Sequence, residues 1–144
     1  MTIRVGINGF GRIGRLAFRI AEQDPDIEVV AINNPSDLEC AAYLAKYDSC
    51  QGRVFDECRA EEGALIVDGH RIKAFQTRDP QELEWGEVGA DVVIESTGKL
   101  KDGTVAKAHL EKGAKKVVIS APAGNDLPTI VYNVNHNTLT KEDN

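Results

Sequence analysis

The chain has 144 residues, of which 42% are hydrophobic and 28% are charged, as is typical of a soluble globular protein. A formal net charge of −6 without any run of lysine or arginine argues against a nucleic-acid partner, and no apolar stretch reaches the roughly 18 residues that a membrane helix needs. The three cysteines lack metal-binding spacing, and their odd number together with the absence of a charged leader predicts one cytoplasmic domain over residues 1–144, with reduced thiols and no metal.

The first third of the chain predicts a strand–helix–strand–helix unit. Ile3–Asn8 and Ile27–Asn33 are short apolar runs typical of buried strands. Between them, residues 12–23 predict a helix whose apolar positions at helical spacing are Leu16, Ala17, Ile20 and Ala21. Ser36 or Asp37 caps a second predicted helix, which runs to about Lys46 and has its inner face at Leu38, Ala41, Ala42 and Ala45.

The middle of the chain has a different pattern. Residues 54–75 predict two or three short strands, with turns at 61–63 and 68–70. The Asp68-Gly69 pair between two apolar runs is a strong signal for a β-hairpin. We therefore expect a small antiparallel insertion at the edge of a parallel sheet.

The alternation of strands and helices resumes after residue 78. A short helical turn at 79–83 precedes a buried strand at 90–95, a helix at 103–112 and a strand at 116–120. After a loop at 121–128, residues 129–134 are expected to add a sixth parallel strand. The whole pattern predicts an α/β fold, a Rossmann-type doubly wound sheet that is mostly parallel and has helices on both faces.

A glycine-rich turn joins the first predicted strand to the first helix. Gly9, Gly11 and Gly14 form G-x-G-x-x-G, in which the first glycine permits a tight turn, the second lets a pyrophosphate approach the backbone and the third lets the helix pack on the strand. The helix amino terminus adds free N–H groups and a partial positive charge. The alternative is a turn without a ligand, but the strand-to-helix context favours a dinucleotide site.

Small polar residues follow four of the predicted parallel strands. They are Asn8, the pair Asn33 and Asn34, residues 95–98, and residues 120–122. Each is by itself typical of an ordinary turn. Because the carboxyl ends of parallel strands meet at one edge of the sheet, these residues together favour a crevice that contacts ribose and nicotinamide.

The end of the second strand bears on the choice of cofactor. NAD-binding domains usually have Asp or Glu here, about 20 residues after the glycines, to accept hydrogen bonds from the adenosine ribose. This chain has Asn33 and Asn34, and an amide neither gains charge assistance nor repels a 2′-phosphate. No Arg or Lys stands beside them, so we expect NAD as the cofactor, with weak discrimination against NADP.

The other titratable residues predict no catalytic group. His70 in a hairpin turn and His109 on a helix are expected to be solvated, and His136 near the crevice has no evident partner acid. Cys50 lies on a predicted loop without an activating neighbour, and Cys40 on a helix and Cys58 in a strand are interpreted as small core or surface thiols.

Several segments resemble phosphorylating glyceraldehyde-3-phosphate dehydrogenases, in the order and at the spacing of that family. They are N-G-F-G-R-I-G-R at 8–15, Y-D-S at 47–49 with Gly52, R-D-P at 78–80, E-S-T-G at 95–98, V-I-S-A-P at 118–122 and N-V-N-H at 133–136. The resemblance covers residues 3 to about 136 and departs at Asn34, where the family usually has Asp. It implies cofactor contacts at Asn8, Phe10, Gly11, Arg12 and Ile13 around the pyrophosphate and ribose, Asn33 and Asn34 at the adenosine ribose, Arg78 beside the adenine, and Ser96, Thr97, Gly98, Ser120 and Ala121 toward the nicotinamide.

The resemblance also implies a cytoplasmic, homotetrameric enzyme of glycolysis. Such an enzyme oxidises glyceraldehyde 3-phosphate with NAD and inorganic phosphate, through a thioester on a cysteine, to 1,3-bisphosphoglycerate. The family's nucleophilic cysteine lies in an A-S-C-T-T-N segment that these 144 residues do not contain, and the resemblance places it beyond Asn144. No catalytic residue is therefore expected within the chain.

Three expectations follow for residues 1–144 on their own. We expect them not to turn over, because acyl transfer needs both a nucleophile and its base. We also expect them to bind NAD weakly and to expose apolar surface that favours self-association. The alternative is a non-catalytic fragment that binds an unknown protein partner, since members of the family on microbial surfaces are reported to bind host proteins.

Overall fold

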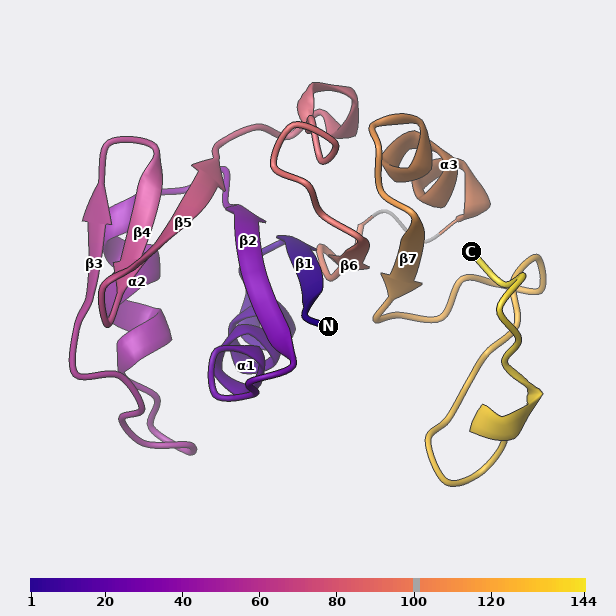
Figure 1. Ribbon diagram of the computed structural model, residues 1–144, viewed down its shortest axis with the longest axis horizontal. Coiled ribbons are helices and arrows are strands. Elements are labelled where there is room, and N and C mark those ends of the chain that lie inside the picture. Colours follow the sequence, from indigo (N-terminus) through magenta and orange to yellow (C-terminus); the bar gives the residue numbers. More distant parts are fainter. Residues whose placement is uncertain (100–101) are drawn as a thin grey trace.

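A computed structural model describes residues 1–99 and 102–144, and in these residues seven strands form one sheet (Figure 1). Its order is β3-β4-β5-β2-β1-β6-β7. Neighbours from β5 to β7 pair in parallel, whereas β4 is antiparallel to both β3 and β5, which confirms the predicted insertion at one edge. The strands are β1 (Ile3–Asn8), β2 (Ile27–Asn33), β3 (Cys58–Glu61), β4 (Ala64–Val67), β5 (His70–Phe75), β6 (Val92–Glu95) and β7 (Lys116–Ile119).

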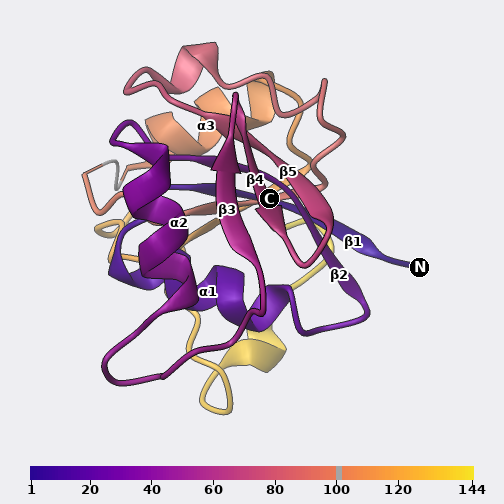
Figure 2. The same cartoon turned by 90° about the vertical axis from the view of Figure 1, so that its left-hand side faces the viewer.

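The helices cover both faces of this sheet. In Figure 2, α1 lies below the strands and α3 lies above them. One hydrophobic cluster joins the sheet to α1 and α2, and a second, around Trp85, joins the opposite face to Leu83 and Ala114. The observed α/β architecture is the predicted mostly parallel, doubly wound sheet. The helices are α1 (Arg12–Ala21), α2 (Leu38–Lys46), α3 (Gly103–Glu111) and the 3₁₀ turns η1 (Pro80–Glu82) and η2 (His136–Thr138).

The two helices of the first cluster differ in how well their inner faces were predicted. The expected inner face of α2 is confirmed, and Asp37 caps this helix by accepting a 2.8 Å hydrogen bond from the Cys40 N–H. In α1 the prediction for Ile20 is wrong, because Ile20 is 69% exposed whereas Phe18 is fully buried. Gly14 and Phe18 determine which side of α1 faces the sheet, because both are buried. Phe18 packs edge-on against Phe10 and Phe55, with ring centroids 5.2 and 5.7 Å away.

The predicted sixth parallel strand at 129–134 is wrong. After β7 the chain leaves the sheet, and residues 132–135 form turns (Figure 1). The β-branched residues of this segment favour a strand, but Asn133 has a positive φ of 61° and the Asn135 side chain accepts a hydrogen bond from the Val131 N–H at 2.6 Å. The two asparagines thus form a local turn, which leaves Tyr132 and Val134 exposed.

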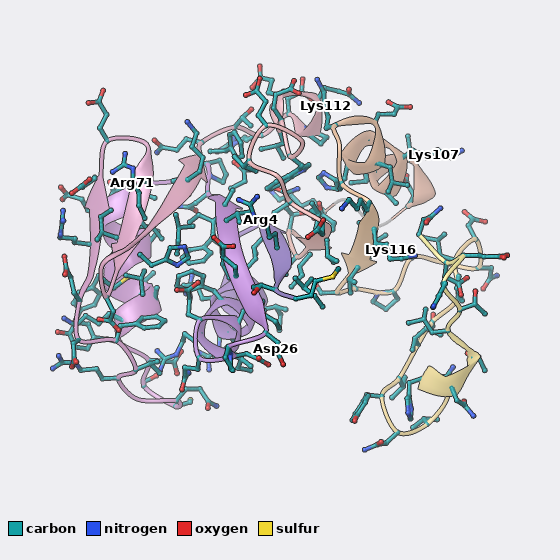
Figure 3. The ribbon with its side chains drawn as sticks, viewed as in Figure 1. Arg4, Asp26, Arg71, Lys107, Lys112 and Lys116 are labelled. Atoms are coloured by element: carbon teal, nitrogen blue, oxygen red, sulfur yellow. The ribbon has the colours of Figure 1, made fainter. Side chains whose placement is uncertain are left out.

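The outer edge of β7 pairs with no other strand in the described part of the chain. Val118 on this strand is 54% exposed. Lys116, labelled on β7 in Figure 3, contacts the carboxyl-terminal segment by donating to the carbonyl of Lys141 at 2.9 Å. An open strand edge beside exposed apolar side chains favours association, so self-association of residues 1–144 stays a prediction. None of the described helices is long and apolar enough to cross a membrane.

Candidate dinucleotide site

A cavity of about 660 Å³ lies where the carboxyl ends of β1, β2 and β6 meet. This is where open α/β sheets bind their ligands. Of the residues predicted for the cofactor site, the structure places nine in the wall of the cavity: Asn8, Gly9, Phe10, Gly11, Asn33, Asn34, Arg78, Ser96 and Thr97.

The three glycines of the turn differ in what a side chain would meet at each position. Gly9 has a φ of 95°, and a Cβ there would lie 2.6 Å from the Thr97 backbone nitrogen. A Cβ on Gly14 would lie 1.9 Å from the carbonyl oxygen of Gly9, so only glycine lets α1 pack this close to β1. A Cβ on Gly11 would meet no atom within 4 Å, although Gly11 lines the cavity. Open space in front of this glycine is what a pyrophosphate needs in order to approach the backbone.

The amino terminus of α1 opens onto the same space. Its N-cap is Gly11, and no side chain in the described part of the chain caps the first-turn N–H groups. These groups and the partial positive charge of the helix end can therefore receive phosphate oxygens. On the other side of the turn, Ser96 Oγ donates to the carbonyl of Gly9 at 2.7 Å and so holds the turn against the end of β6.

The remaining predicted cofactor residues lie outside the cavity wall. Gly14 lies behind the turn, and Ile13 is 53% exposed on α1. The Arg12 guanidinium forms an ion pair with Asp48, which also accepts hydrogen bonds from the N–H groups of Gln51 and Cys50 at 2.8 and 2.9 Å. The pKa of Asp48 is lowered to about 2, chiefly by the hydrogen bond from the Gln51 N–H and then by the hydrogen bonds from Cys50 and Arg12. Gly98, Ser120 and Ala121 follow β6 and β7 but do not line the cavity.

The last residues of the chain also lie outside the cavity wall. Asn144, beyond which the nucleophilic cysteine is expected, is exposed and does not line the cavity. The segment before it contacts β7 instead, through the bond from Lys116 to the carbonyl of Lys141. Asn144 is therefore not part of the cavity wall, and the position of the nucleophile stays a prediction.

Asn33 is the last residue of β2 and Asn34 follows it, and the side chains of both make hydrogen bonds. Asn33 Nδ2 donates to Asn8 Oδ1 at 2.8 Å and to the Thr77 carbonyl at 2.9 Å, while its Oδ1 accepts from the Thr77 N–H at 3.1 Å. Asn34 Nδ2 donates to the carbonyls of Ser36 and Asp37 at 3.2 and 3.3 Å. The Asn34 side-chain oxygen is thus the group left to accept a hydrogen bond from a ribose hydroxyl.

The prediction that His109 is solvated is wrong. His109 is fully buried, with Nε2 2.8 Å from Glu95 Oε2 and Nδ1 2.9 Å from the Trp85 indole nitrogen. Glu95 is also fully buried. Sequence reasoning noted Glu95 only as a polar strand end and missed both partners, because the 14 and 24 residues that separate them from His109 give no local signal. The one available hint is the single tryptophan, whose indole N–H needs an acceptor when it is buried.

The other histidines and the cysteines lie away from the cavity, except Cys40 in its wall. His70 is half-buried rather than solvated, with Nδ1 3.1 Å from Glu22 Oε2, and His136 is on η2, where its Nδ1 accepts from the Asn133 N–H. Burial raises the pKa of the Cys58 thiol to about 11, which disfavours the reactive thiolate. Among the described residues, no group of three or more His, Cys, Asp or Glu could hold a metal ion.

The parallel sheet, the glycine turn against the end of β6 and the open helix terminus define a dinucleotide-binding domain. Residues 3–103 match the family model described as the NAD binding domain of glyceraldehyde 3-phosphate dehydrogenase, and the chain belongs to this family. Its cofactor is accordingly NAD.

Similar proteins from distant organisms carry the same family name. The chain is 56% identical over 136 residues to glyceraldehyde-3-phosphate dehydrogenase of Clostridium pasteurianum, covering 94% of this chain and 41% of the relative. It is 53% identical over 135 residues to that of Geobacillus stearothermophilus, covering 94% and 40%. It is 49% identical over 142 residues to the cytosolic protein of Trypanosoma brucei brucei, covering 99% and 43%. The chain thus spans about 40% of the length of these curated relatives.

Proposed function

We propose that residues 1–144 are the cofactor-holding part of a glyceraldehyde-3-phosphate dehydrogenase. In a protein of the relatives' length, they would bind NAD while glyceraldehyde 3-phosphate is oxidised, with inorganic phosphate, to 1,3-bisphosphoglycerate. The observation that carries this proposal is the open space in front of Gly11, between the amino terminus of α1 and the carboxyl ends of β1 and β6. The proposal includes a cytoplasmic location and assembly of the longer protein as a homotetramer.

Residues 1–144 supply NAD binding without the acyl-transfer chemistry, whose nucleophile the proposal places beyond Asn144. A cysteine nucleophile needs an activating base within hydrogen-bond reach. Burial holds the Cys58 thiol in its protonated form, and no described histidine forms a hydrogen bond with Cys40 or Cys50. The proposed binding is weak, because three of the five residues expected toward the nicotinamide, Gly98, Ser120 and Ala121, do not line the cavity, and Ser120 is exposed.

Calorimetric titration with NAD tests this function directly. We expect saturable binding to the unmodified chain, and at least about tenfold weaker binding to a Gly11→Ala variant, because the added methyl group projects into the space meant for the pyrophosphate. Gly11 has a φ of −77°, so alanine fits the backbone and the fold should be preserved.

Gly103→Ala is the matched control, since a Cβ there also meets no atom within 4 Å but lies at the start of α3. This variant should bind NAD as the unmodified chain does. Absence of saturable NAD binding to the unmodified chain would contradict the proposed function and would leave the protein-interaction alternative.

A second prediction concerns NADP. In an Asn34→Asp variant, a carboxylate would stand where an amide now lines the cavity, and its charge would repel a 2′-phosphate. We expect the ratio of NAD affinity to NADP affinity to rise about tenfold, measured by parallel titrations with the two cofactors. NAD affinity itself should change little, because two effects oppose each other. A carboxylate accepts a stronger hydrogen bond from the ribose hydroxyl, but the bonds that Asn34 Nδ2 donates to the carbonyls of Ser36 and Asp37 are lost. An unchanged preference would show that Asn34 does not set cofactor discrimination.

A further inference from the structure

A buried polar network lies directly beneath the cofactor cavity. It links Trp85 after η1, His109 on α3, Glu95 at the end of β6 and Asn8 at the end of β1. All four side chains are at least 98% buried. Every described polar side-chain atom that is fully buried has a hydrogen-bond partner, so this network is closed.

The chemistry of the tryptophan fixes the proton on His109. An indole nitrogen can only donate, so His109 Nδ1, 2.9 Å from Trp85 Nε1, must accept and carries no proton. The imidazole proton is therefore on Nε2, which donates to Glu95 Oε2 at 2.8 Å. In this arrangement His109 is neutral and its tautomer is determined by contacts on both sides of the ring.

The Glu95 carboxylate accepts from four donors, and the structure thereby keeps it ionised. Oε2 accepts from His109 Nε2 and, at 2.6 Å, from Asn8 Nδ2, while Oε1 accepts from the N–H and Oγ1 of Thr97 at 3.0 and 2.5 Å. Burial alone would raise the pKa of Glu95, but the hydrogen bonds from His109, Thr97 and Asn8 outweigh it and hold the pKa below its ordinary value. Ionised Glu95 therefore stabilises the fold at neutral pH, and this contribution is lost as the pH falls through that lowered pKa. His109 is the one titratable side chain among these partners.

Two of the three residues that donate to Glu95, Asn8 and Thr97, lie in the cavity wall. Because Asn8 Nδ2 donates to Glu95, Asn8 Oδ1 faces Asn33 and accepts a hydrogen bond from Asn33 Nδ2. Asn33 Nδ2 also donates to the Thr77 carbonyl. The two hydrogen bonds from Thr97 to Glu95 fix the backbone N–H and the hydroxyl group of Thr97. Asn8, Asn33, Thr77 and Thr97 all line the cavity, whereas Glu95 and His109 do not. We propose that Glu95, with its His109 partner, is a positioning residue that sets the direction of the hydrogen bonds the cavity wall offers to NAD. This inference rests on NAD occupying that cavity.

A Glu95→Gln substitution separates charge from shape. Glutamine has one side-chain oxygen, so its amide nitrogen must face either the Thr97 donors or the donors of Asn8 and His109. Two donors then lose their acceptor, and the side chains in the cavity wall can reorient. We expect NAD affinity to fall at least about tenfold in titrations. Glu84→Gln is the control. Glu84 makes a partly exposed ion pair with Lys112 at the carboxyl end of α3, and its replacement should leave NAD affinity unchanged.

Exchanging the amide and the carboxylate provides a rescue. In the double variant Glu95→Gln/Asn8→Asp, a carboxylate oxygen replaces Asn8 Nδ2, which lies 2.6 Å from Glu95 Oε2 and 3.5 Å from His109 Nε2. The carboxylate at position 8 can accept from the new amide and from His109, and its other oxygen still accepts from Asn33. Asn8→Asp alone places two carboxylates in contact and should be the weakest binder. We expect the double variant to recover most of the NAD affinity lost in Glu95→Gln.

Nitrogen NMR of the unmodified chain gives an independent readout that does not depend on a variant folding. The ring-nitrogen shifts of His109 should show a proton on Nε2 and none on Nδ1 at neutral pH. A proton on Nδ1, a folded Glu95→Gln variant with unchanged NAD affinity, or a folded double variant no better than Glu95→Gln would each overturn the inference. Failure of the unmodified chain to bind NAD would instead contradict the proposed function, which the NMR measurement does not test.

Discussion

Replacing Gly14 by alanine is expected to destabilise the domain by about 2 kcal/mol and to abolish measurable NAD binding. The new Cβ would lie 1.9 Å from the Gly9 carbonyl oxygen and 2.9 Å from Ser96 Oγ. The serine hydroxyl can rotate away, but the carbonyl is part of the turn itself. To relieve the contact, α1 must move away from β1, and this movement opens the packing of Phe18 against Phe10.

Two opposing effects decide the size of this result. Alanine inside a helix is favoured over glycine by about 1 kcal/mol. Overpacking against backbone costs about 3 kcal/mol, the upper end of the usual range, because no side-chain rotation relieves it. Urea unfolding followed by circular dichroism measures the difference. Gly103→Ala again serves as control, since it brings the helix preference without a clash and should raise the urea midpoint or leave it unchanged. If Gly14→Ala unfolds at the same urea concentration as the unmodified chain, the close approach of α1 to the turn is not required.

The glycine turn could be predicted from the sequence because its signal is local. Strand, glycines and helix follow one another between Ile3 and Ala21, and the Asp68-Gly69 hairpin and the Asp37 cap are equally local. Residues at the ends of β1, β2 and β6 could be predicted to meet, since parallel strands bring their carboxyl ends to one edge. The cavity wall was therefore accessible to sequence reasoning in its main parts.

Side-chain partners across the fold could not be predicted in this way. The Glu95–His109 pair depends on how α3 returns over β6, and the Arg12–Asp48 pair depends on the loop after α2. His109 was expected in solvent and Arg12 beside the pyrophosphate, but each of them contacts a carboxylate of the protein instead. At 129–134 the local β preference was outweighed by two asparagines that form a turn. Local patterns thus located the site, while long-range packing decides which of its side chains are available to a ligand.

Replacing Trp85 by alanine is expected to cost more stability than any other single truncation on its side of the sheet. Trp85 is fully buried, packs edge-on against Phe75 with ring centroids 5.6 Å apart, and lies so close to β1 that a Cβ on Gly6 would be 2.6 Å from its ring. Removing a buried tryptophan side chain costs about 3–5 kcal/mol. The unpaired His109 Nδ1 adds about 1–3 kcal/mol, because a buried acceptor would lose its donor.

The sum approaches the whole stability of an ordinary domain, about 5–15 kcal/mol, so Trp85→Ala should be largely unfolded or close to its midpoint without denaturant. Trp85→Phe retains an aromatic ring but not the indole N–H, and should lose less stability. Tyr132→Ala, at an aromatic residue that is 78% exposed, should change stability by no more than about 0.5 kcal/mol. Circular dichroism across a urea series ranks the three variants. Equal urea midpoints for Trp85→Ala and Tyr132→Ala would mean that the second hydrophobic cluster contributes little, and that α3 and the Glu95 network above it are held by the strands alone.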